Sequence, residues 1–274
     1  LEEWFKNVGL GFNPFGSEAA ELDCRLPTYA APANAERVRG HQPTLVIGKP
    51  GTGKTATAML LAHSYDHPNA AFYEKRAFPI YCSIPSTALT NDIRRHPLEM
   101  MARATARSLL QFLPLYPKSF QKLLSGKRET VGALLFTCAG SKDHLLSELR
   151  RVVKDEREYR RMARAFETLS PHIWPATRQD EAAWLELLAS AIPDDFDHLY
   201  LFADIHPPTA AGKTWEQVQP LFDLATPLAN RDIYLKLFIP EIAMDPVEGE
   251  RAAIDTVLLK WEAPDRALIQ FIFP

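Results

Sequence analysis

The chain has 274 residues, 46% of them hydrophobic and 24% charged, with a net charge of −3 at pH 7. These values are typical of a globular α/β protein that buries a substantial core, and they exclude a general electrostatic attraction to nucleic acid or to an anionic membrane. No apolar run approaches the length of a membrane span, so a membrane partner is not expected. The three cysteines lie far apart without metal-binding spacing, which predicts reduced thiols and a cytoplasmic location.

The first part of the chain is predicted to be a lead-in segment over residues 1–38, followed by one domain over 39–274. Short helices are expected at 17–22 and 35–38. The β-branched, apolar run 44–47 predicts a buried strand, and the spacing of apolar residues in 55–64 predicts a helix. A second strand is expected at 77–82, and Pro79 near its start favours a position at the sheet edge.

A helical insertion is predicted over about 92–192. Within it, helices are expected at 98–113, 118–124, 143–169 and 182–191. Strands then return, and apolar runs predict them at 198–203, 233–239 and 256–261. Helices are expected at 214–225, with a break or kink at Pro220, and at 263–271.

Strands that alternate with helices indicate a mostly parallel sheet covered on both faces. The fold class is therefore predicted to be α/β, with a five-stranded sheet flanked by helices. The helical insertion would lie between the second and third strands.

The junction between the first strand and its helix carries a phosphate-binding motif, G-x-x-x-x-G-K-[ST]. Its residues are Gly48, Lys49, Pro50, Gly51, Thr52, Gly53, Lys54 and Thr55, with Ala56 next in the helix. Consecutive backbone N–H groups and the positive end of a helix dipole suit a polyphosphate, and glycines let the backbone approach it. Lys54 would reach the β and γ oxygens, and the Thr55 hydroxyl would bind Mg²⁺. The motif predicts a P-loop that binds ATP or ADP with Mg²⁺.

A second metal-binding group is expected at the end of the third strand. Asp204 follows the apolar run 199–203, where an acid commonly holds the magnesium ion, often through water. An acid that only caps the strand is the alternative.

Hydrolysis needs a group that orients water and a cation that stabilises charge on the phosphoryl group. No carboxylate follows Asp204 directly. His206 is a candidate for orienting water, and Glu241 lies where a γ-phosphate sensor is common. Arg231 and Arg266 are candidates for the cation. For each, an ordinary loop or surface residue is the alternative.

These residues resemble the ASCE division of P-loop ATPases, and within it the bacterial STAND-type proteins related to AAA+ and Orc-like ATPases. The resemblance rests on the P-loop, the strand that ends in Asp204, the strand 234–240 and the lead-in Asn13-Pro14-Phe15. It implies a sheet ordered 5-1-4-3-2, ATP as the nucleotide, and a switch driven by binding and hydrolysis. It also implies a C-terminal lid and sensor domains. The apolar end of the chain predicts a piece of a longer protein that stops before them.

The long helix predicted at 143–169 would carry a stripe of basic residues at intervals of three and four. They are Arg150, Lys154, Arg157, Arg161 and Arg164. A solvated face with ion pairs within the helix is one interpretation, and an anion-binding stripe within 150–164, for nucleic-acid phosphates, is the other.

Three functions remain open from the sequence. The first is an ATPase switch that acts on further domains of the same protein or on protein partners. The second is a nucleotide-binding scaffold that does not hydrolyse ATP, which the missing acid after Asp204 favours. The third is a phosphotransferase whose substrate lid is the helical insertion.

Overall fold

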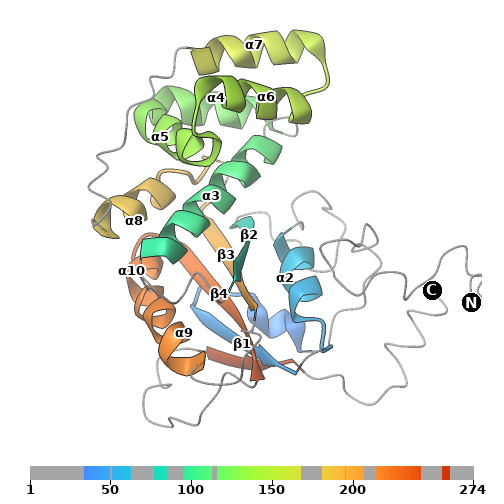
Figure 1. The fold of residues 1–274 in the computed structure, drawn as a ribbon, viewed down its shortest axis with the longest axis vertical. Helices are drawn as coiled ribbons and strands as arrows, with labels where there is room; N and C mark the ends of the chain where they lie inside the picture. The colour runs from blue at the N-terminus through green and yellow to red at the C-terminus, as the bar shows by residue number, and fades with distance from the viewer. Residues whose placement is uncertain are drawn as a thin grey trace, which may run out of the picture.

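Five parallel strands form one sheet in the computed structural model, and helices cover both of its faces (Figure 1). The structure describes residues 34–49, 51–62, 77–85, 95–112, 116–167, 181–194, 196–206, 214–241 and 255–259. The helices expected at 17–22 and 263–271 lie outside these ranges. Among the described residues, no helix is both long enough and apolar enough to cross a membrane.

The strands run in the order β2-β3-β4-β1-β5, which is 5-1-4-3-2 when counted from the opposite edge. Their bounds are β1 Thr44–Gly48, β2 Ala77–Pro85, β3 His198–His206, β4 Ile233–Pro240 and β5 Asp255–Leu258. β2 pairs only with β3 within this sheet, so Pro79 lies in an edge strand as expected. Because all five strands are parallel, their carboxyl ends meet at one edge.

Alternate residues of each strand point to opposite faces of the sheet. In β3, Leu199, Leu201, Ala203 and Ile205 join the larger core cluster, whereas Tyr200 and Phe202 join the smaller one. The smaller cluster also contains residues of α2 (Lys54–Ala62) and of the 3₁₀ helix η3 (Ala35–Val38). Asp204 has the same parity as Tyr200 and Phe202, so it faces the α2 side.

The other face of the sheet carries the larger cluster. The helices α9 (Thr214–Asp223) and α10 (Ala225–Ala229) contribute to it, as does the insertion between β2 and β3. The described part of the insertion has six helices: α3 (Arg95–Phe112), α4 (Pro117–Gly126), α5 (Arg128–Ala139), α6 (Lys142–Val152), α7 (Glu156–Glu167) and α8 (Glu181–Ala189).

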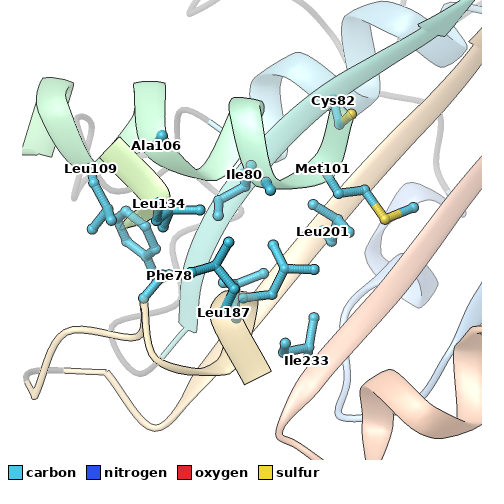
Figure 2. Close-up of a cluster of buried hydrophobic side chains, with 14 of the residues drawn as sticks. Phe78, Ile80, Cys82, Met101, Ala106, Leu109, Leu134, Leu187, Leu201 and Ile233 are labelled. Carbon is cyan, nitrogen blue, oxygen red and sulfur yellow. The ribbon is translucent and has the colours of Figure 1, made fainter. Parts of the chain in front are cut away.

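The insertion docks on the sheet through apolar side chains of α3 and α8. Figure 2 shows Met101 and Leu109 of α3 and Leu187 of α8 beside Phe78 and Ile80 of β2. These residues are all buried. The insertion and the sheet therefore share one core.

The single helix predicted over 143–169 is wrong, because two helices, α6 and α7, meet there at a break over residues 153–155. Val153 has an extended backbone, and the Asp155 carboxylate accepts a hydrogen bond from the Glu158 N–H at 2.8 Å. Asp155 therefore caps the start of α7 and fixes the break.

The basic stripe is consequently not one helix face. Arg150 in α6 pairs with Glu156 at 2.8 Å and lies 4.7 Å from the Tyr159 ring centre. Arg161 pairs with Glu158 at 2.5 Å. Two of the five residues of the predicted stripe are thus held in exposed ion pairs, and Lys154 lies in the break between the helices.

A lysine with no exposed surface lies in β4. Lys236 donates hydrogen bonds to the carbonyls of Gly40 and Gln42, both at 2.8 Å, and to the Thr44 hydroxyl at 3.1 Å. Its ammonium lies 5.2 Å from the Tyr200 ring centre. These contacts satisfy the buried charge and hold the segment before β1 against the sheet.

Candidate functional site

The turn between β1 and α2 brings the phosphate-binding motif to the carboxyl edge of the sheet. The Lys49 carbonyl accepts hydrogen bonds from the Thr52 N–H at 3.2 Å and from the Thr52 hydroxyl at 2.8 Å. Gly51 and Gly53 have φ angles of 81° and 76°, which glycine adopts without strain. Pro50, also in the motif, lies outside the described residues.

Gly48 lies where this turn is tightest. A Cβ atom at Gly48 would be 2.4 Å from the Thr52 hydroxyl oxygen and 3.3 Å from the Lys54 Cγ atom. A side chain here would displace the turn, so the sequence requirement for glycine has a steric cause at this position.

The first turn of α2 points toward the same place. The first backbone bond into this helix runs from the Thr57 N–H to the Gly53 carbonyl at 2.8 Å. Lys54, Thr55 and Ala56 precede Thr57 and have no carbonyl partner four residues earlier within the helix. Their N–H groups and the helix dipole favour an anion.

The Lys54 side chain crosses the turn. Its ammonium donates hydrogen bonds to the carbonyls of Gly48 at 2.8 Å and Lys49 at 3.0 Å. Partial burial lowers the pKa of Lys54, while the carboxylates of Asp204 and Glu241 act in the opposite direction. The ammonium is thus held at the turn by carbonyl groups that an anionic ligand can replace.

Asp204 lies next to the start of α2, although it is far from it in sequence. Only 2% of its side chain is exposed, and its Oδ2 atom accepts a hydrogen bond from the Thr55 hydroxyl at 2.6 Å. The structure therefore brings together the two residues that the sequence analysis named as metal ligands.

Tyr81 is a contact that sequence reasoning missed. Its hydroxyl donates to Asp204 Oδ2 at 3.3 Å from the neighbouring strand β2. Tyr81 lies on the same face of β2 as Ser83, and Ser83 lies beside Asp204 in the β2–β3 register. That register cannot be read from β2 alone.

Two further candidates border the same site. His206 Nε2 lies 3.8 Å from Asp204 Oδ2. Glu241 follows Pro240, which lies beside Gly48 in the β1–β4 register. Its carboxylate weakly opposes the larger effect of burial, which lowers the pKa of Lys54.

The structure does not bring Arg231 to the site. Arg231 precedes β4 and donates to the Pro227 carbonyl at 3.1 Å, so it lies at the amino edge of the sheet. The eight residues of β4 separate it from the turn by roughly 26 Å at ~3.3 Å per residue. Its assignment as the stabilising cation is therefore wrong for this arrangement, and Arg266 lies outside the described residues.

Within the described ranges, no group of three or more His, Cys, Asp or Glu side chains could hold a metal ion. The site instead offers two oxygen atoms, from Thr55 and Asp204, beside an ammonium group and a helix N-terminus. This combination suits a metal ion that arrives with an anionic ligand.

Comparison with known proteins gives no assignment. No protein family, no curated protein and no solved structure matches this chain. Its function therefore has to be argued from the site itself.

Proposed function

We propose that this domain binds a nucleoside triphosphate, ATP, together with Mg²⁺, and acts as a hydrolysing P-loop switch of the ASCE and STAND type. One observation carries the proposal: the Lys54 ammonium and the Thr55–Asp204 pair converge at the start of α2. The motif alone predicts the position of the Lys54 ammonium. The 2.6 Å contact between Thr55 and Asp204, which are far apart in sequence, supports the proposal independently.

The phosphates would bind to the turn that contains Gly51 and Gly53 and to the first N–H groups of α2. Lys54 would exchange its two carbonyl partners for phosphate oxygens. A charged partner gives a stronger hydrogen bond than a neutral carbonyl, so the exchange favours binding.

The Thr55 hydroxyl and the Asp204 carboxylate are hard oxygen donors, which fits Mg²⁺. Bound magnesium would neutralise charge on the phosphates and orient them. Asp204 is almost fully buried, so its carboxylate is held in place for this role by Thr55 and Tyr81.

For hydrolysis, two side chains can orient water. His206 adjoins Asp204 through the 3.8 Å contact, and Glu241 lies near Lys54. Both candidates thus lie near a residue of the proposed site, His206 near Asp204 and Glu241 near Lys54.

A second function, a nucleotide-binding scaffold without turnover, is favoured by the residue after Asp204. Ile205 is 2% exposed and belongs to the core on the opposite face of the sheet. The position where many related ATPases carry a second acid is thus occupied by a core side chain that points away from the site.

Calorimetric titration with Mg²⁺-ATP tests the binding site. Lys54→Ala should weaken binding at least tenfold, because the variant loses the charged phosphate contact. Lys122→Ala, an exposed lysine in α4, is the matched control and should bind as the wild type does. Equal affinity of Lys54→Ala and wild type would contradict the proposal.

Phosphate release separates the two functions. The switch predicts turnover that Asp204→Asn abolishes, because the metal loses its anionic ligand. The scaffold predicts thermal stabilisation by Mg²⁺-ATP with no phosphate release above background.

A further inference from the structure

Although the predicted basic stripe is divided between two helices, α7 by itself carries a face of arginines. Its four members are all exposed: Arg157, Arg160, Arg161 and Arg164. At ~100° per residue they fall within an arc of about 100° on one side of the helix. The acidic residues of α7, which are Glu156, Glu158 and Glu167, lie outside this arc. These four residues, here named the arginine face, therefore present charge of one sign to solvent.

The opposite side of α7 fixes the helix to the insertion. Met162 and Phe166 are buried, and the Phe166 ring centre lies 5.8 Å from that of Phe120 in α4. The Lys142 ammonium donates to the Glu167 carbonyl at 2.7 Å, at the last residue of the helix. In Figure 1, α7 lies at the end of the insertion away from the sheet. The arginine face is thus held on a fixed helix and is turned away from the helices on which α7 packs.

The guanidinium groups of this face are available to an anion. Within the described residues, Arg157 and Arg164 form no ion pair. Arg160 pairs with Glu156 at 2.9 Å and Arg161 with Glu158 at 2.5 Å, but all four of these side chains are largely exposed. Exposed ion pairs contribute little, so both arginines can exchange their carboxylate for another anion.

We propose that the arginine face binds the phosphate backbone of duplex DNA without reading its sequence. This activity goes beyond the proposed nucleotide switch and does not depend on it. Guanidinium groups bind phosphate through two parallel hydrogen bonds, which a lysine ammonium does not provide. The chain as a whole has a net charge of −3, so the attraction is confined to this surface.

The composition of the face favours a phosphate backbone over other anionic partners. No apolar or aromatic residue lies within its arc, whereas the centre of a protein interface is enriched in such residues. Sites for single-stranded nucleic acid likewise use aromatic rings to stack bases. A helix that lies on a membrane inserts its apolar side, and the apolar side of α7 is already buried in the insertion.

The dimensions of α7 favour DNA over RNA. A helix is about 10–12 Å wide with its side chains, and the major groove of B-form DNA is about 12 Å wide. The major groove of an RNA duplex is deep and narrow. From Arg157 to Arg164 the helix rises about 10 Å, which matches the rise of about three base pairs of DNA.

Fluorescence anisotropy of a labelled random-sequence DNA duplex of about 20 base pairs, without ATP, tests this proposal. The logarithm of the association constant should fall with the logarithm of salt concentration, with a slope of about −3.6 for four phosphate contacts. In the double variant Arg157→Gln, Arg164→Gln the slope should shrink to about −1.8, and affinity in about 50 mM salt should fall at least tenfold.

The matched control is Arg37→Gln, Arg103→Gln, which removes the same charge from exposed arginines of η3 and α3. It should bind DNA as the wild type does. No binding by the wild type, or equal slopes in both double variants, would overturn the proposal. Tighter binding of polyglutamate than of DNA would indicate an acidic protein partner instead, and equal binding of an RNA duplex would refute the preference for DNA. Calorimetry with Mg²⁺-ATP is a separate measurement, and the Arg157→Gln, Arg164→Gln variant should bind the nucleotide as the wild type does.

Discussion

At the scale of single residues, Gly48 lies where the site has no room for a side chain. The Thr52 hydroxyl, which is bonded to the Lys49 carbonyl, occupies the position that a Cβ atom would need. The turn can therefore keep its shape only while residue 48 lacks a side chain.

Gly48→Ala should accordingly destabilise the protein by about 1–3 kcal/mol, the usual cost of overpacking. Urea unfolding measures this change. Gly126→Ala is the control, because a Cβ there meets nothing within 4 Å, and this residue ends α4. An unchanged free energy of unfolding in Gly48→Ala would show that the turn adapts.

Lys54 gives a prediction about pH. Burial lowers the pKa of Lys54 below 10.5, so the empty site loses its ammonium charge before an unfolded lysine would. ATP affinity should be highest below the lowered pKa and fall as pH rises through it toward 10.5. Over this window, bound phosphates favour the ammonium form, so binding should take up protons.

Calorimetry in two buffers of different ionisation enthalpy measures this proton uptake. Lys54→Arg keeps its charge at these pH values, so its affinity should not change with pH over the window. Proton release on binding by the wild type would contradict the assigned cause.

The main residues of the site could be predicted from sequence because they belong to local patterns. Gly48, Lys54 and Thr55 lie within one motif, and Asp204 ends an apolar run. Tyr81 could not be found this way, since its contact depends on the register between β2 and β3. Arg231 was proposed wrongly because only its residue type was considered, and not the edge of the sheet at which it lies.

At the scale of elements, the break between α6 and α7 depends on one cap. Asp155→Ala should reduce the free energy of unfolding by about 1 kcal/mol, the typical value of an N-cap hydrogen bond. Asp155→Asn retains an acceptor oxygen and should lose only a few tenths. Urea unfolding of both variants checks this, and equal losses would point to charge rather than to the hydrogen bond.

The helices that sequence reasoning missed or merged have two different physical causes. α5 is buried along much of its length, including Val131, Leu134 and Leu135, so it lacks the polar face that marks an amphipathic helix. The pattern over 143–169 kept its spacing across the α6–α7 break, which hid the cap at Asp155. Strands were easier to predict because each is a short apolar run of a sheet buried on both faces.

At the scale of the whole molecule, the reactivity of one buried thiol reports on the core between the sheet and the insertion. Cys82 of β2 is buried beside α3 (Figure 2), and burial raises its pKa to about 12. The thiol is therefore both inaccessible and unreactive in the folded protein.

In a Cys24→Ser, Cys138→Ser background, alkylation of Cys82 should be slow in buffer and should accelerate in urea together with the loss of circular dichroism. The agreement of the two transitions would show that the insertion and the sheet unfold together. Rapid alkylation in buffer, without urea, would instead mean that the insertion separates from β2 while the sheet stays folded.

The strand pairing of β1 also affects the order in which the protein folds during its synthesis. β1 leads into the turn that we propose binds phosphate, yet both of its neighbours, β4 and β5, come from the far part of the sequence. On a translating ribosome, the insertion helices have local partners early, whereas β1 waits until most of the described chain has emerged. The proposed nucleotide site is thus completed late, and a ribosome-bound intermediate that lacks β4 should not bind nucleotide.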